Sequence, residues 1–193
     1  MLSGMRVIAG TYRGRQLYGP RKLALRPTSD RVREALFSIL GNRLPNSRFL
    51  DLYAGTGAVG IEAVSRGAEH VTSVESNRDA VKLLHQNRQL CRIGEEMSVF
   101  SQAVQQFLNR PDQWYGPYTI VFADPPYAEA SDLPALLAEP ATDDLFAMDA
   151  WLVIEHAAKT ALPMSLGCTQ FLRRYRYGDT ALSLYVRPQT VPL

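Results

Sequence analysis

The stretch LDLYAGTGAVG, residues 50–60, decides the fold that the sequence predicts. An apolar run leads into three glycines at positions 55, 57 and 60, and the helix-like segment AVGIEAVSRG begins among them. This G-x-G-x-x-G spacing suits a tight turn from a strand into a helix that approaches a bound nucleotide. Glu75 follows Gly55 by twenty residues, where a carboxylate can accept hydrogen bonds from ribose hydroxyls. The stretch therefore predicts a Rossmann-like domain with a nucleoside-containing cofactor.

Strand and helix patterns alternate from residue 48 onward, which favours a parallel sheet with helices on both faces. One of the expected helices is NRDAVKLLHQNRQL (77–90), which Asn77 could cap. The end of the chain differs, because CTQFLRRYRYG (168–178) and ALSLYVR (181–187) are strand-like runs with no helix between them. At the front, RVIAG and GRQLYG predict a small separate hairpin, and RVREALFSIL predicts a helix over 31–40. We expect an α/β fold with a seven-stranded, mostly parallel sheet closed by a C-terminal antiparallel hairpin. We assign it to residues 47–193, after a hairpin-and-helix extension over residues 1–46.

The bulk composition is that of a globular protein of ordinary size. The 193 residues fit one domain of ordinary size with a sizeable core, and 46% of the side chains are hydrophobic and 21% charged. No stretch resembles a signal peptide or reaches membrane-spanning length. The two cysteines, Cys91 and Cys168, have no metal-type spacing and are most simply small buried thiols. We therefore expect a cytoplasmic protein with no membrane partner, and nothing in the sequence requires more than a monomer.

Positive charge is concentrated at the front of the chain. Residues 1–48 hold ten of the 21 Lys and Arg side chains and only two of the 19 acids, whereas the remaining residues hold eleven and seventeen. Such asymmetry favours a polyanion bound at one end of the molecule, although a solvated basic face is the alternative. The candidates for contacts with the phosphates of such a polyanion are Arg6, Arg13, Arg15, Arg21, Lys22 and Arg26.

Asp51 decides which nucleoside-containing cofactor the glycine loop suits. It lies four residues before Gly55, where a carboxylate would repel the pyrophosphate of NAD. It could instead accept a hydrogen bond, directly or through water, from a cationic amino-acid group. We therefore favour S-adenosylmethionine, which carries an ammonium and a sulfonium. In the alternative interpretation, Asp51 only caps the turn at the end of its strand.

The stretch ADPPYAEA, residues 123–130, follows the apolar run YTIVF. A proline holds the preceding residue extended and has no N–H of its own, so Asp124 is extended and Pro125 and Pro126 keep carbonyl acceptors in a rigid loop. Asp124 and the Pro125 carbonyl could accept both hydrogens of an exocyclic amine, and Tyr127 could stack on the base. The alternative is a rigid turn after a strand.

These motifs together carry a family resemblance that covers nearly the whole chain. DPPY at 124–127 and DLYAGTG at 51–57 resemble the class I methyltransferases that modify exocyclic amines of nucleobases. The front segment RVIAGTYRGRQL…LRPTSDRVREALFSIL, GIEAVSRGA, and the closing YGDTALSLYVR narrow the resemblance to the bacterial 16S rRNA (guanine-N2)-methyltransferase family RsmD.

The resemblance implies a donor, a substrate and a set of site residues. The donor is S-adenosylmethionine, and the substrate is one guanine N2 in 16S rRNA, free or within the small ribosomal subunit. The amine-binding loop is Asp124, Pro125, Pro126 and Tyr127. The cofactor residues are Asp51, Ala54, Gly55, Thr56, Gly57, Glu75, Ser76, Gln102 and Ala103. Many relatives have Asp or Asn where this chain has Gln102, whose amide can still accept from the adenine amine.

Other readings of the same residues remain open at this stage. The DPPY loop would also serve an adenine-N6 or cytosine-N4 methyltransferase. A non-catalytic RNA-binding protein could use the same scaffold, but the intact motif residues argue against it. An NAD-dependent oxidoreductase leaves the double proline and the basic front unexplained. No metal site is expected, because the three histidines form no ligand pattern.

Overall fold

The computed structural model describes residues 2–19 and 30–189. Its main sheet has eight strands in the order β5-β4-β3-β6-β7-β10-β9-β8, and the five strands from β5 to β7 run parallel. The last three pair antiparallel, so the predicted closing hairpin is confirmed as β9 and β10. The strands are β3 (Arg48–Leu52), β4 (His70–Val74), β5 (Met97–Phe100), β6 (Tyr118–Ala123), β7 (Phe146–Ala157), β8 (Ser165–Leu166), β9 (Thr169–Tyr177) and β10 (Thr180–Val186).

The mostly parallel sheet is confirmed, with one strand more than the seven expected. The additional strand is β8, which has only two residues and lies at the edge of the sheet against β9. A pairing this short leaves little periodic pattern in the sequence, so alternation of side chains could not predict it.

Within the described residues, five α-helices and three short 3-10 helices precede or connect these strands. Asn77 caps α3 as expected, because its side chain accepts from the backbone N–H groups of Asp79 and Ala80. The helices are α1 (Asp30–Leu40), η1 (Gly41–Arg43), α2 (Ala58–Ser65), α3 (Arg78–Cys91), α4 (Val104–Leu108), η2 (Pro111–Gln113), α5 (Leu133–Leu137) and η3 (Pro140–Leu145).

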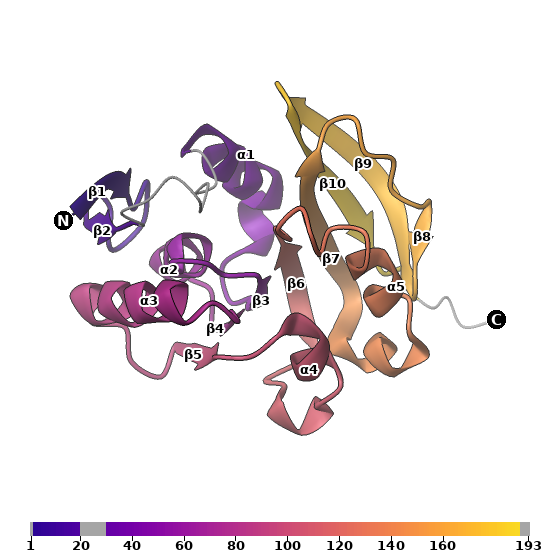
Figure 1. Cartoon of the computed structure of the whole chain (residues 1–193), viewed down its shortest axis with the longest axis horizontal. Coiled ribbons are helices and arrows are strands. Elements are labelled where there is room, and N and C mark those ends of the chain that lie inside the picture. Colours follow the sequence, from indigo (N-terminus) through magenta and orange to yellow (C-terminus); the bar gives the residue numbers. More distant parts are fainter. Residues whose placement is uncertain (1, 20–29, 190–193) are drawn as a thin grey trace.

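Alternate side chains of the central strands pack into two separate cores, one on each face of the sheet. Phe49 and Ile120 pack with residues of α1, α2 and α3, whereas Leu50 and Val121 pack with residues of α4 and α5. This alternation is the two-residue period of a strand that is buried on both faces. The result is a three-layer α/β arrangement, in which α1–α3 cover one face and α4–α5 the other (Figure 1).

The order of strands changes direction between β3 and β6. The chain moves outward from β3 through β4 to β5, then returns to place β6 on the other side of β3. In open α/β sheets, ligands bind outside the carboxyl ends of the strands at such a point. The topology therefore directs attention to the segments that follow β3, β4 and β6.

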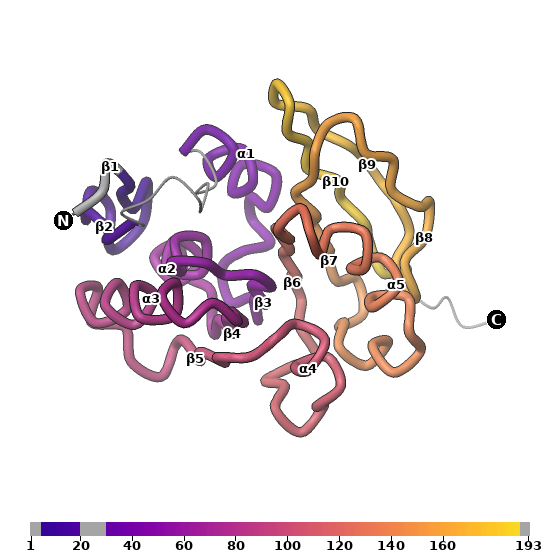
Figure 2. The backbone as a smooth tube through the Cα atoms, viewed as in Figure 1, coloured from indigo at the N-terminus to yellow at the C-terminus, as the bar shows by residue number. Residues whose placement is uncertain are grey.

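The N-terminal hairpin forms its own two-stranded sheet from β1 (Leu2–Arg6) and β2 (Gln16–Tyr18). Figure 2 shows it on the side of the molecule that carries α2 and α3, away from β9 and β10. Its residues Met5, Val7 and Leu17 are buried in the same core as α1, α2 and α3. The boundary predicted at residue 46 stays a prediction, since the extension shares this core with the following domain.

Two polar side chains of α2 hold the loop of this hairpin. The fully buried carboxylate of Glu62 accepts from the backbone N–H groups of Ile8 at 2.7 Å and Ala9 at 2.9 Å. Ser65 Oγ accepts from the N–H of Tyr12 at 2.9 Å and donates to the carbonyl of Ala9 at 2.6 Å. Sequence analysis assigned no role to either residue, although a glutamate inside the apolar helix AVGIEAVS was a usable signal.

Candidate active site

Three carboxylates meet at the carboxyl edge of the sheet. Leu52 in β3 is aligned with Val74 in β4 and with Ala123 in β6, so the three strands end at the same level. Glu75 and Asp124 are the first residues beyond β4 and β6, and Asp51 lies one residue inside the end of β3. The predicted cofactor and amine-binding residues are therefore brought to one place by the strand register.

The carboxyl group of Asp51 is buried beneath the glycine loop, with 1% of the residue exposed. Its Oδ2 accepts from the N–H of Gly60 at 3.1 Å, which is the turn-capping contact that sequence analysis held as an alternative. Burial is the largest of the effects that together raise the pKa of Asp51 to about 8. The hydrogen bond from Gly60 opposes this rise, and the nearby carboxylates of Asp124 and Glu75 add to it. The site therefore gathers negative charge that a bound cation would relieve.

The glycine loop needs left-handed backbone and close packing. Gly55 has φ of 55° and Gly57 has φ of 80°, values that side chains with a Cβ rarely adopt. A Cβ on Gly57 would also lie 2.8 Å from Cγ of Leu84 in α3. Ala54 and Thr56 are almost fully buried in the same loop, and the Ala54 N–H donates to the Val74 carbonyl at 2.9 Å. The loop is thus held against both β4 and α3.

Glu75 already accepts two backbone hydrogen bonds in this structure. Its Oε2 accepts from the Gly55 N–H and its Oε1 from the Asn77 N–H, both at 2.7 Å. A carboxylate oxygen has a second lone pair, so each oxygen keeps capacity for a ribose hydroxyl. Its role as the ribose acid stays a prediction, as does that of the exposed Ser76 beside it.

Gln102 and Ala103 follow β5 at the start of α4. The Gln102 side chain is half-buried, and its Nε2 donates to Oε1 of Gln113 at 2.7 Å. This bond directs the amide N–H toward Gln113 and leaves the Oε1 as an acceptor for an adenine amine. Gln102 also lines a hollow of about 360 Å³ together with Gln106, Asn109 and Arg110. That hollow lies along α4, outside the three-carboxylate edge.

The DPPY loop presents an exposed aromatic ring beside a partly buried acid. Asp124 and Pro125 are half-buried, whereas Pro126 is exposed and Tyr127 is 81% exposed. The carbonyl of Pro126 accepts from the N–H groups of Glu129 and Ala130, at 2.9 and 3.0 Å. The expectation that both proline carbonyls stay available is therefore wrong for Pro126. Among residues 2–19 and 30–189, none donates a hydrogen bond to the carbonyl of Pro125.

Tyr53, between Asp51 and the glycines, is a site residue that sequence analysis missed. It has φ of 65°, in a left-handed region that non-glycine residues seldom occupy. Burial raises the pKa of its phenol, and the carboxylates of Glu129 and Asp132 beyond the DPPY loop raise it further. Tyr53 therefore joins the cofactor loop to the segment that follows Tyr127. The aromatic residue in DLYAG was the available signal.

The basic residues of the extension are only partly described. Arg6, Arg13 and Arg15 are exposed, as RNA-binding candidates should be. Arg15 also donates to the Leu90 carbonyl of α3 at 2.8 Å and lies over the ring of Tyr12. Arg21, Lys22 and Arg26 lie outside the described residues.

Neither a metal centre nor a membrane helix is found in the described part of the chain. Over residues 2–19 and 30–189, no group of three His, Cys, Asp or Glu side chains could hold a metal ion. No helix in the same ranges is both long and apolar enough to span a bilayer.

We predict that Asp51→Asn reduces the pH dependence of stability. The folded-state pKa of Asp51 is raised to about 8, so its favourable contribution is complete below about pH 4 and is lost as the pH rises toward 8. The free energy of unfolding of Asp51→Asn, relative to the unsubstituted protein, should therefore increase by on the order of 1 kcal/mol per pH unit between pH 5 and 7. Urea titrations at several pH values measure this, and a difference that is constant with pH would contradict it.

Comparison with known proteins identifies the family to which this chain belongs. The family model described as conserved hypothetical protein 95 matches residues 5–186. Ribosomal RNA small subunit methyltransferase D of Escherichia coli is 35% identical over 95% of this chain and 90% of its own, and Bacillus subtilis YlbH is 33% identical over 94% and 98%. The solved structure of Escherichia coli yhhF superposes with a TM-score of 0.80 at 32% identity, over 95% of this chain and 98% of that one. The chain therefore belongs to the conserved hypothetical protein 95 family, which includes the bacterial small-subunit rRNA methyltransferases D.

Proposed function

We propose that this protein transfers a methyl group from S-adenosylmethionine to the exocyclic N2 of a guanine in 16S rRNA. The observation that carries the proposal is the meeting of three carboxylates, Asp51, Glu75 and Asp124, between the glycine loop and the DPPY loop. The names of the family relatives support rRNA as the substrate class. Cytoplasmic location and a monomeric state are parts of the same proposal.

The three carboxylates at the ends of β3, β4 and β6 suit a cationic nucleoside better than a dinucleotide. When bound, S-adenosylmethionine supplies a methyl group on a positively charged sulfur, which makes that methyl group electrophilic. Asp124 provides negative charge for the cation, and Asp51 would add to it by ionising beside the bound cation. A pyrophosphate would instead be repelled by these carboxylates. Glu75 would accept from the ribose hydroxyls, and Gln102 would accept from the adenine amine through the oxygen that its bond to Gln113 leaves available.

Asp124 and the carbonyl of Pro125 would hold the amine that is methylated. An aromatic amine is a weak nucleophile because its lone pair is delocalised into the ring, so the site must position the nitrogen accurately. Two acceptors on its two hydrogens fix its direction and stabilise the positive charge that develops as the new bond forms. A strong base is not required, because the alkylated nitrogen is acidic and releases its proton readily.

Tyr127 gives the loop a surface on which a base can stack. Its ring is largely exposed in the free protein, three residues after the carboxylate that would bind the amine. Sequence-specific enzymes read unstacked RNA bases in this way, and each stacked base contributes about 1–3 kcal/mol. A base that is swung out of the RNA would therefore find an accessible ring on which to stack.

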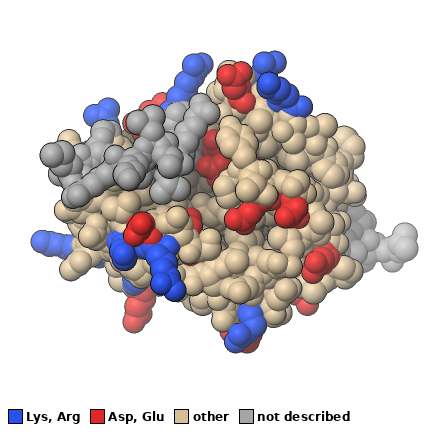
Figure 3. All heavy atoms as spheres, in the orientation of Figure 1, with Lys and Arg blue, Asp and Glu red and all other residues tan. Residues whose placement is uncertain are grey.

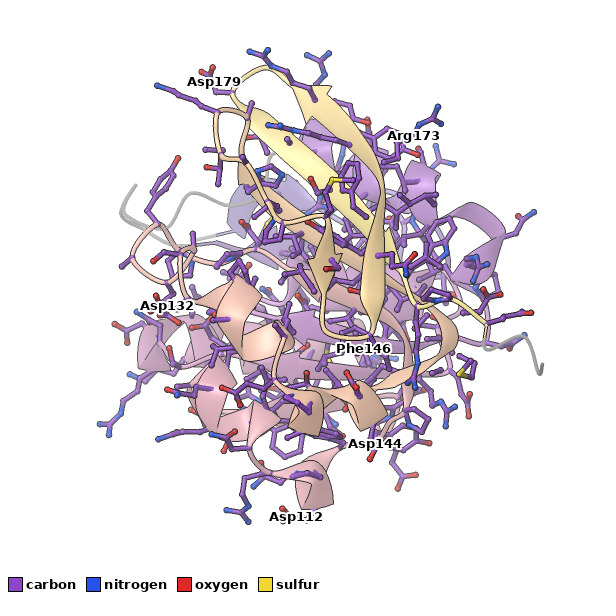
Figure 4. All side chains as sticks on the ribbon, turned by 90° about the vertical axis from the view of Figure 1, so that its right-hand side faces the viewer. Asp112, Asp132, Asp144, Phe146, Arg173 and Asp179 are labelled. Carbon is purple, nitrogen blue, oxygen red and sulfur yellow. The ribbon has the colours of Figure 1, made fainter. Side chains whose placement is uncertain are left out.

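The extension would bind the phosphate backbone beside this site. On the face shown in Figure 3, Asp and Glu lie mainly in the middle and most Lys and Arg stand toward the outline. Figure 4 shows Asp132 of the loop and Asp179 of the closing hairpin on the same side of the molecule, with Arg173 on the opposite side. RNA phosphates would be repelled by the acids around the DPPY loop, so backbone affinity has to come from cations farther out.

We predict that Asp124→Ala abolishes measurable methyl transfer. With radiolabelled S-adenosylmethionine and unmethylated 16S rRNA or small subunits, the unsubstituted protein should produce labelled N2-methylguanosine. Loss of an acceptor that acts in the transition state should lower the rate by about a hundredfold or more. Asp132→Asn is the matched control, because this exposed carboxylate lies on the same segment and should leave the rate near normal.

The labelled product separates the proposal from its alternatives. Label in methyladenosine or methylcytidine would retain the chemistry of the loop and overturn the guanine assignment. A protein that binds RNA but neither binds S-adenosylmethionine nor transfers label would be a non-catalytic scaffold. Full activity in Asp124→Ala would contradict the role of the DPPY loop.

We also predict that Arg13→Ala weakens RNA binding without changing the product. Arg13 is exposed on the hairpin, and removal of one phosphate contact should lower the salt slope of log K by about 1. Filter binding at several salt concentrations measures the slope. Lys82→Ala, an exposed cation on α3 paired with Asp79, is the control, and an equal loss in both variants would contradict a specific phosphate contact.

A further inference from the structure

A buried amide in α3 touches both the N-terminal extension and the cofactor loop. Asn87 is 0% exposed. Its Nδ2 donates to the Tyr18 carbonyl and to the Thr56 carbonyl, both at 3.0 Å, and its Oδ1 accepts from the Tyr18 N–H at 2.7 Å. One amide hydrogen therefore binds the N-terminal extension and the other binds the glycine loop. Asn87 therefore fixes the end of β2 relative to the glycine loop.

The glycine loop, which Asn87 contacts at Thr56, is packed so tightly on α3 that it has little freedom to move independently of that helix. Thr56 lies between Gly55 and Gly57, and Gly57 is packed so closely against Leu84 that a Cβ there would approach to 2.8 Å. Leu84 and Asn87 are one helical turn apart and face the loop together. A change in the loop on cofactor binding would therefore be transmitted to α3 and to Asn87.

The other end of the connection leads into the proposed RNA-binding segment. Tyr18 is the last residue of β2, and Arg21 and Lys22 follow it within four residues. Arg15 precedes it in the same strand region and donates to the Leu90 carbonyl of α3. The backbone held by Asn87 thus lies three residues after Arg15, a described cation that we assign to RNA phosphates.

We propose that Asn87 is a positioning residue that couples cofactor binding to RNA binding. The proposal rests on the proposed function, since it assumes both ligands. A ligand that orders the glycine loop would, through Asn87, also order the end of β2 and lower the ordering cost of the second ligand. Coupling of this kind is reciprocal, and factors of about 5 to 150 are typical.

The two anchors on α2 provide a matched control. Glu62 and Ser65 bind the hairpin loop at residues 8–12. Among the described residues, neither side chain forms a hydrogen bond with the cofactor loop. Ser65→Ala should therefore loosen the hairpin and lower stability while leaving the connection between Tyr18 and Thr56 intact. Asn87→Ala removes that connection.

The test measures RNA affinity with and without S-adenosylhomocysteine, the unreactive product of methyl transfer. Filter binding uses an end-labelled, unmethylated 16S rRNA transcript, and calorimetry measures S-adenosylhomocysteine affinity with and without the RNA. The unsubstituted protein should bind each ligand about fivefold or more tightly when the other is saturating, by the same factor in both directions. In Asn87→Ala the factor should fall to about 1, and in Ser65→Ala it should persist, a split that a merely stabilising role would not produce.

A second measurement decides the matter where Asn87→Ala does not fold. Hydrogen exchange of the unsubstituted protein should show that S-adenosylhomocysteine slows exchange of the Tyr18 amide, which donates to Asn87. Unchanged exchange at Tyr18 would overturn the proposal, as would two measurable affinities without coupling, coupling that survives in Asn87→Ala, or coupling lost equally in Ser65→Ala. Failure of the unsubstituted protein to bind either S-adenosylmethionine or S-adenosylhomocysteine would instead overturn the proposed function, and this proposal with it.

Discussion

The crowding of negative charge at one end of the parallel strands is the constraint on which the site depends. Asp51 is buried with only one backbone N–H donated to it by Gly60, while Asp124 and Glu75 lie near enough to raise its pKa. Burial disfavours the ionised form of a carboxyl group, so without a nearby cation Asp51 is held protonated. A cation bound beside it would stabilise the ionised form. A ligand with a sulfonium and an ammonium supplies that compensation, and a phosphate-bearing ligand does not.

A second set of buried polar side chains connects the N-terminal extension to the helices beside the candidate site. Glu62, Ser65 and Asn87 are buried side chains of α2 and α3 whose hydrogen bonds reach back to the hairpin. The helices that support the glycine loop are therefore the ones that hold the proposed RNA-binding segment. The proposed cofactor and RNA contacts would therefore share a common support, although the residues assigned to them are far apart in sequence.

The sequence predicted the strands and helices whose apolar side chains recur at a regular spacing, and the residues that form known motifs. The parallel strands, the Asn77 cap and the closing hairpin all followed from alternation or capping rules. Two-residue β8, left-handed Tyr53 and the buried bonds of Asn87 did not, because each is decided by tertiary packing. The roles of the site residues remain predictions, since only ligand binding can test them. The boundary at residue 46 also remains a prediction, because the extension shares its core with the following domain.

Proton release on cofactor binding tests the central claim most directly. Asp51 is held mainly protonated at pH 7 by its surroundings, so a bound cation should ionise it. Calorimetry of S-adenosylmethionine binding in buffers of different ionisation enthalpy should then show release approaching one proton, with Asp51→Asn releasing almost none and NAD failing to bind. Tighter binding of NAD, or cofactor binding with no proton exchange at pH 7, would contradict a site built on compensated carboxylates.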